Sequence, residues 1–360
     1  MLEQFKVKEE DAVRVQEQQL RETVVGIFEK MNVPTEDAKL AADVLIASDL
    51  RGVDSHGVSN MLRNYVNSYN SGAYNPRPNL RIVREAPSAA TMDCDGGLGI
   101  IQAPRAMELA IRKASQTGVG MVTMLNGRHL GMASYHAMLA LEHDMIGICM
   151  TSTRPSVVPT YGREPRFGTN PIALAAPAKT EPPFVFDAAT SAVASNKFEL
   201  ARRLRVPLEP GWMTAPDGTP VMEPAPVPDT VFGVPLGATR ELGSHKGYGF
   251  ACIVEILCGL LSGCGFGMTS GKAGRYSHMV AAYDIDAFTP VDEFKEMMDD
   301  FLRSLRDTPP AQGQERVLYA GLPESEVEQD RRANGIPLHS EVIQWFKDIC
   351  SELDVPFSLA

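Results

Sequence analysis

The chain of 360 residues is too long for one small core, so its length predicts about two or three packed units. Its 44% apolar and 22% charged residues are typical of a globular protein and argue against a disordered chain. With 34 basic and 45 acidic residues the net charge is −11, which argues against nucleic acid as a partner. A small anionic substrate would need a few placed cations working against this overall field.

The first 75 residues show the periodicity of helices, because apolar residues recur at three- and four-residue steps. Pro34 is expected to end the first helix, and Thr35 to cap the second. The second helix should end near Arg51 and Gly52, and a third at Gly72, before a proline-containing linker. The apolar positions of the first and third helices are Val13, Leu20, Val24, Ile27, Phe28, Met31, Leu62, Tyr65, Val66 and Tyr69.

From about residue 80 to residue 290, short β-rich runs alternate with helical patterns, which predicts an α/β or α+β layer. The expected strands are residues 88–94, 118–125, 146–151, 172–175, 184–186 and 279–285. The expected helices between them are residues 103–117 and 133–143.

After residue 285 the pattern turns helical again, with Thr289 as a cap, Pro290 in the first turn and a final helix around Trp345. We therefore predict one helical domain formed by both chain ends, residues 1–76 and 289–360. An α/β domain, residues 77–288, is inserted between them.

The most apolar segment, residues 247–268, contains Glu255 and six glycines, so we expect a buried helix and a turn instead of a membrane span. Residues 1–8 lack the apolar run of a signal peptide. The six cysteines form no C-x-x-C pair, which predicts buried thiols in a reducing compartment. We therefore expect a cytoplasmic protein that binds no membrane.

Glycine motifs for nucleotides are absent. A Rossmann dinucleotide site needs G-x-G-x-x-G between a strand and a helix, and the glycines at 96–99 and 265–271 have other spacings. A P-loop and a G-x-S-x-G elbow are also missing, which argues against an NTPase and against a hydrolase.

Three of the seven histidines, His129, His136 and His143, repeat every seven residues. On a helix this spacing separates neighbours by about 10.5 Å, too far to share one metal ion. We therefore predict no metal site, and we interpret His136 and His143 as partly exposed helix residues.

Two histidines stand where ligands bind. His56 follows a helix end in a turn with Ser55, close to Arg51, which suits proton transfer to a carboxylate-bearing substrate. His129 lies between an apolar strand and a helix, a favoured position for ligands. The alternatives are a surface histidine that caps its loop and an incidental histidine at a helix start.

Two further segments carry polar groups. Asp187 ends an apolar strand and could orient a histidine, or it could cap the next helix. Lys246 opens the apolar helix among glycines, where a phosphate could bind, or it could be a solvated lysine in a tight turn.

Taken together, these segments resemble one family, the type-2 malate/L-lactate dehydrogenases, which also contains ureidoglycolate and L-sulfolactate dehydrogenases, diketogulonate reductase and piperideine-carboxylate reductases. The similarity extends from about residue 10 to residue 340, and the order and spacing of its pieces make it specific. The matching residues are 49–57, 128–131, 168–171, 186–190, 246–249, Gly321 and 332–336.

The resemblance implies a non-Rossmann mixed sheet that binds NAD or NADP, with NAD favoured, and an active site near the interface of a homodimer. It implies that His56 is the proton donor and acceptor, with His129 and Asp187 as further catalytic candidates. Ser55, Arg51 and Asn60 are the expected substrate-binding residues. The positions matching cofactor contacts are Thr169, Asn170, Phe186, Asp187, Ala188, Ala189, Thr190, His245, Lys246 and Gly321.

One position departs from the family. Members often have an arginine four residues after the first histidine, where it clamps the substrate carboxylate, but this chain has Asn60, with Arg51 and Arg63 as substitutes. This departure bears on the substrate more than on the reaction. From the resemblance as a whole we expect oxidation of a malate- or lactate-type 2-hydroxy acid. A 2-keto acid or cyclic-imine reductase, or a catalytically dead dimeric binding protein with the same fold, stays open as an alternative.

Overall fold

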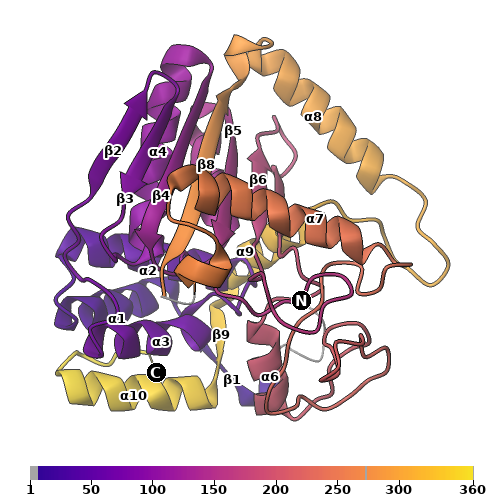
Figure 1. Ribbon diagram of the computed structural model, residues 1–360. Helices are drawn as coiled ribbons and strands as arrows, with labels where there is room; N and C mark the ends of the chain where they lie inside the picture. The colour runs from indigo at the N-terminus through magenta and orange to yellow at the C-terminus, as the bar shows by residue number, and fades with distance from the viewer. Residues whose placement is uncertain (1–6, 272–273, 360) are drawn as a thin grey trace.

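The computed structural model describes residues 7–271 and 274–359. It places helices from both chain ends below a seven-stranded sheet, with one long helix across the front of the sheet and a loop-rich lobe beside it (Figure 1). The predicted class, a mixed α/β fold, is confirmed.

The two chain ends share one apolar core. A short antiparallel ribbon joins them, pairing Val15 with Ile336, and large side chains such as Phe28 and Phe346 are fully buried beside it. The elements of this unit are β1 (Ala12–Val15), α1 (Glu17–Lys30), α2 (Thr35–Leu50), α3 (Val58–Asn70), β9 (Ile336–His339) and α10 (Ser340–Leu353).

Three details of the predicted helices are wrong. Val13 lies in the strand β1, because it pairs with Leu338 from the other end of the chain. Thr35 is the first residue of α2 and makes no cap; its hydroxyl donates to Glu29 instead. Pro290 precedes the helix that begins at Val291, so the predicted start is one residue early.

The sheet has the order β2-β3-β4-β8-β5-β6-β7, and only β3 and β4 are parallel among the strand pairs of the described residues. All six predicted strands are present. The strand β2 was missed because every one of its residues is exposed, so it lacks a buried face that alternation could reveal. The strands are β2 (Arg81–Ala86), β3 (Ala89–Asp93), β4 (Val119–Gly127), β5 (Met145–Ser152), β6 (Ile172–Ala176), β7 (Phe184–Ala188) and β8 (Tyr276–Asp284).

Helices cover both faces of the sheet. Along β8, Val280 and Ala282 face a core with α4 and α5, while Met279 and Ala281 face the helix α7, as strand alternation requires. Within the described chain no helix is long and apolar enough to cross a membrane. The covering helices are α4 (Gly99–Thr117), α5 (Ala133–Met138) with its 3-10 extension (Leu139–His143), and α7 (Ser244–Val254), which continues as a π-helix (Glu255–Leu260).

Three further helices complete the fold: α6 (Asn196–Leu204), α8 (Val291–Arg306) and α9 (Leu322–Asn334). Leu302 on α8 packs near Phe184 of β7, so α8 lies along the sheet and not among the chain-end helices. The helix α9, which the sequence analysis did not predict, begins next to β7 and runs towards the loop between α2 and α3. These contacts close one end of the cavity described below.

Candidate active site

One edge of the sheet faces the loop between α2 and α3. Antiparallel pairing brings the last residues of β5 beside the first residues of β8, and Ile172 at the start of β6 beside the end of β7. A cavity of about 280 Å³ lies between this edge and the loop. It is lined by Arg51, Val53, Ser55, His56, Gly131, Met132, Ala133, Ser134, Thr169, Pro171, Val185, Phe186, Asp187, Ala189, Ala194, Ala320, Gly321 and Glu324.

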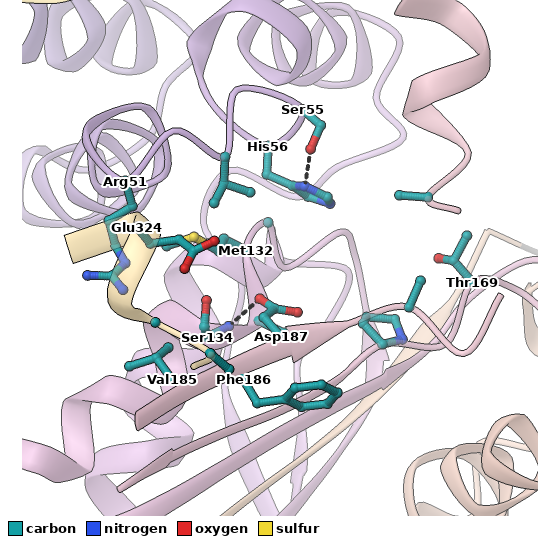
Figure 2. A pocket seen from close by; sticks show the side chains of 18 residues that line it. Arg51, Ser55, His56, Met132, Ser134, Thr169, Val185, Phe186, Asp187 and Glu324 are labelled. Atoms are coloured by element: carbon teal, nitrogen blue, oxygen red, sulfur yellow. Dashed lines mark hydrogen bonds between the residues drawn. The ribbon is translucent and has the colours of Figure 1, made fainter. Parts of the chain in front are cut away.

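Eight of the predicted site residues therefore meet at one cavity, although they come from four separate segments of the chain. Figure 2 shows His56 on one side of this cavity and Asp187 on the other, with Thr169 at one end. The eight residues are Arg51, Ser55, His56, Thr169, Phe186, Asp187, Ala189 and Gly321.

His56 is held by the loop that connects α2 and α3. Its Nδ1 lies 3.0 Å from the hydroxyl of Ser55, and Asn196 donates to the Ser55 carbonyl over 2.8 Å. The buried Asp49 fixes the end of the loop, because its carboxylate accepts from the backbone N–H of Val58, the first residue of α3. Burial lowers the pKa of His56 to about 4, so its ring is neutral at neutral pH.

Asp187 occupies the opposite side, near the end of the edge strand β7. The backbone N–H of Ser134 donates to its carboxylate over 2.7 Å. Desolvation raises the pKa of Asp187 to about 6, and the nearby Glu324 adds to this rise, although the residue is exposed to solvent. The carboxyl group therefore changes its charge close to neutral pH.

Gly321 lets the start of α9 approach β7 closely. Its φ is +99°, and a Cβ there would lie 2.8 Å from the backbone nitrogen of Val185. The neighbouring carbonyl of Ala320 accepts from that nitrogen over 3.0 Å. A side chain at position 321 would therefore push α9 away from the cavity.

His129 lies behind His56 and does not line the cavity. The two imidazole rings are stacked, with centroids 5.7 Å apart and an interplanar angle of 8°. Burial, with His56 and His278 adding to it, lowers the pKa of His129 to about 3. The structure thus brings both predicted histidines together but exposes only one of them to the cavity.

The remaining predicted cofactor residues lie outside this cavity. Asn170 is fully buried, where it accepts from the backbone N–H of Thr153 and donates to Glu255. His245 contacts Arg240, and Lys246 is exposed on the first turn of α7. The other two residues, Ala188 and Thr190, follow Asp187 along the chain.

The structure places Asn60 and the two arginines considered for the substrate carboxylate, Arg51 and Arg63, in three different environments. Arg51 lines the cavity but is buried and paired with Glu328 over 2.8 Å. Asn60 donates to the carbonyl of Asp54, and Arg63 lies over the ring of Trp345 at 5.1 Å, both outside the cavity. Arg51 is therefore the cation that the described residues bring to the cavity wall.

Sequence reasoning missed several residues of the site, among them Ser134, Met132, Glu324 and Tyr65. Ser134 and Met132 line the cavity at the start of α5, and Glu324 lines it from α9. Tyr65 donates to or accepts from His129 over 2.8 Å. No signal could have singled out Tyr65, because its spacing in α3 is that of an ordinary core residue.

The interpretation of His136 as partly exposed is wrong. Its side chain is fully buried and its Nε2 contacts the carbonyl of Leu130 over 2.7 Å. His143 is exposed at the end of the 3-10 turn, in agreement with the prediction. Across residues 7–271 and 274–359, no group of three His, Cys, Asp or Glu side chains is arranged to hold a metal ion.

Known proteins resemble this chain along nearly its whole length. Residues 15–347 match the malate/L-lactate dehydrogenase family. A malate dehydrogenase from Pyrococcus horikoshii is 40% identical over 352 residues, covering 96% of this chain and 97% of that enzyme. An L-sulfolactate dehydrogenase from Methanocaldococcus jannaschii is 34% identical and covers 92% and 95% of the two chains.

A solved structure agrees with these matches. The crystal structure of malate dehydrogenase from Entamoeba histolytica has a TM-score of 0.91 to this chain at 32% identity, covering 96% of this chain and 99% of its own. The chain therefore belongs to the malate/L-lactate dehydrogenase family, and it is a hydroxy-acid dehydrogenase.

Proposed function

We propose that the cavity between His56 and Asp187 oxidises a small 2-hydroxy acid of malate or lactate type, with NAD or NADP as the acceptor. The observation that carries this proposal is the placement of a neutral imidazole and a titrating carboxyl group on opposite sides of one cavity. The oxidation needs an acceptor for the proton of the substrate hydroxyl, which His56 provides. It also needs a negative charge that attracts the oxidised nicotinamide, which Asp187 provides when ionised.

The residues fit a nicotinamide. Phe186, Val185 and Met132 supply apolar surface for a flat ring, and Thr169 and Asp187 supply polar atoms. The cavity of about 280 Å³ is small for a whole dinucleotide, so the rest would extend over the sheet edge towards Lys246. This mixed sheet, instead of a Rossmann fold, would then bind the cofactor, with Ala188, Ala189, His245 and Gly321 as further contacts. The buried Asn170 and Thr190 would support these contacts from behind.

When bound, the oxidised nicotinamide accepts the hydride from C2 of the substrate. His56 accepts the hydroxyl proton, because its neutral ring keeps a lone pair at neutral pH. Ser55 orients that ring, and Arg51 attracts the substrate carboxylate from the cavity wall. The ion pair between Arg51 and Glu328 weakens this attraction.

A reductase of a 2-keto acid or cyclic imine is the second candidate. The observation that favours it is the pKa of about 6 at Asp187, which makes this carboxyl a better proton donor near neutral pH than a histidine titrating near 4. In that direction the substrate carbon receives the hydride and Asp187 supplies the proton.

The test is a scan of 2-hydroxy acids, 2-keto acids and a cyclic imino acid, each with NAD(H) and NADP(H), followed by cofactor absorbance. Turnover of malate, lactate or sulfolactate supports the dehydrogenase. Turnover of the imine or keto acid alone would favour the reductase. Cofactor binding without any turnover would leave the catalytically dead binding protein.

We propose a homodimer with the active site near its interface. One face of α7 and its π-helical continuation carries large apolar side chains that are between 44% and 56% exposed. Such a continuous apolar face is typical of an interface between subunits. Its members are Phe250, Ile253, Ile256, Leu260 and Leu261. Sedimentation of the wild type and of Ile256→Asp would test the dimer.

We also propose the predicted division into two domains and the predicted cellular location. The shared core of the chain ends supports a helical domain from residues 1–76 and 289–360 around an inserted domain, residues 77–288, although α8 packs on the inserted part. All six cysteines are free thiols, which supports a cytoplasmic location.

A further inference from the structure

We infer that Tyr65 is a positioning residue that keeps the proton of His129 on Nε2, so that this nitrogen can only donate a hydrogen bond. The consequence for catalysis rests on the proposed function, but the protonation state of His129 does not. Of the two stacked histidines, His56 is then the one that can carry the proton.

The backbone of Gly131 sets the first constraint. Its N–H lies 3.2 Å from Nδ1 of His129 and can only donate, so this contact favours a lone pair on Nδ1. A neutral imidazole has one donor and one acceptor nitrogen, so a lone pair on Nδ1 means that the proton resides on Nε2.

Tyr65 sets the second constraint. Its hydroxyl lies 2.8 Å from the same Nδ1, and its side chain is fully buried in α3. Burial raises the pKa of the phenol, so it keeps its proton and donates it. Two donors thus converge on Nδ1. A proton on Nδ1 would point towards the hydrogens of both donors, which disfavours that tautomer.

The groups around His129 also oppose its positive charge. The ring of His56 is stacked against it, His278 of β8 lies nearby, and Tyr65, which contacts His129, is itself close to Tyr74. Together with burial they lower the pKa of His129 to about 3. His129 therefore stays neutral, with its acceptor nitrogen already occupied.

His56 differs in the partner of its ring. The hydroxyl of Ser55 can rotate and act as donor or acceptor, so Nδ1 of His56 can be protonated or not. When Nδ1 carries the proton, Nε2 has a free lone pair and can accept the proton of a substrate hydroxyl. His56 can therefore exchange a proton in turnover, whereas His129 can only donate a hydrogen bond from Nε2.

The test uses holoenzyme labelled with ¹⁵N-histidine and observed by long-range ¹H–¹⁵N NMR, with His129 assigned through His129→Gln. We expect an acceptor-type Nδ1 and a protonated Nε2 at neutral pH. In Tyr65→Phe the Nδ1 signal should move towards the average of the two tautomers, and kcat should fall about five- to tenfold while KM changes little. A protonated Nδ1 in the wild type would overturn the inference, even if Tyr65→Phe did not fold.

The matched control is Tyr69→Phe, one turn further along α3. The hydroxyl of Tyr69 is buried but has no hydrogen-bond partner among the described residues, so its loss should leave the His129 signals unchanged. Equal effects of both substitutions would show a merely structural role and overturn the inference. The expected signals in a protein without turnover would refute the proposed function and leave the role of Tyr65 standing.

Discussion

The cavity has two walls of different construction. The helical wall, formed by Arg51, Val53, Ser55 and His56, is a loop between two helices. The sheet wall, formed by Val185, Phe186, Asp187 and Ala189, follows the edge strand β7. Ion pairs and a buried aspartate hold the first wall, and backbone hydrogen bonds hold the second.

The same desolvation acts on both walls with opposite results. It lowers the pKa of His56 to about 4 and raises the pKa of Asp187 to about 6, because desolvation favours the neutral form of each group. The two walls are thus suited to different tasks. We expect changes on the helical wall to affect kcat and changes on the sheet wall to affect cofactor affinity.

The largest expected effect is at His56. Proton transfer by a positioned side chain contributes about 10²–10⁴-fold to a rate, so His56→Ala should lower kcat by about that factor. Cofactor affinity, measured by fluorescence titration, should stay nearly unchanged. The exposed His143 provides the control variant His143→Ala. A small loss at position 56 with a large loss for His129→Ala would reverse the roles of the two histidines.

Lys246 tests how far cofactor binding extends beyond the sheet wall. If it makes a charged hydrogen bond to the dinucleotide, Lys246→Ala should weaken binding by about 1.5–3 kcal/mol with kcat unaffected. Lys30→Ala, on the distant helix α1, is the matched control. Unchanged cofactor affinity in Lys246→Ala would remove this residue from the site.

Each wall has one glycine whose replacement by alanine should displace it, because the added methyl group would meet neighbouring atoms. A Cβ on Gly57 would lie 1.8 Å from the carboxylate of Asp49, and one on Gly321 would lie 2.8 Å from the backbone of Val185. Each substitution by alanine should cost about 1–3 kcal/mol in urea unfolding. Gly57→Ala should lower kcat, and Gly321→Ala should raise the cofactor Kd.

The control for this pair is Gly249→Ala, where an added Cβ has no atom within 4 Å. Because Gly249 lies inside α7, the alanine should stabilise the protein by about 0.5–1 kcal/mol through helix propensity and leave the kinetics unchanged. If Gly57→Ala and Gly321→Ala altered the same kinetic parameter, the two walls would not be independent.

The smallest expected effect is a pH dependence from Asp187. Its carboxyl is ionised above pH of about 6 and protonated below it, so the charge that attracts an oxidised nicotinamide is lost as the pH falls. Oxidation measured as kcat/KM should therefore decline below about pH 6. The titration of His56 affects this rate only near pH 4, because its pKa of about 4 lies well below the pKa of about 6.5 of a free histidine.

Asp187→Asn removes this titration and should make the profile flat between pH 5 and 7, apart from a uniform loss of cofactor affinity. A decline that persists near pH 6 in Asp187→Asn would assign the titration to another group.

Periodicity predicted much of the fold because it records which side chains face a core. The apolar residues at three- and four-residue steps in α3 and the alternation in β8 are local patterns that can be recognised in the sequence alone. The strand β2, with every residue exposed, and the helix α9, in which only Leu322 is buried, lack such a pattern, and they were missed. The pairing of Val13 with Leu338 could not be read either, because it joins opposite ends of the chain.

By itself the sequence determined the family, the mixed α/β class and a set of polar candidates that includes His56, His129 and Asp187. Only the tertiary structure decided that His56 faces the cavity, that His129 lies behind it against Tyr65, and that Asn60 points elsewhere. The reason is physical: a pKa and a tautomer depend on desolvation and on donors such as Gly131 and Tyr65. In this site those donors and the surrounding protein atoms come from segments that only folding brings together.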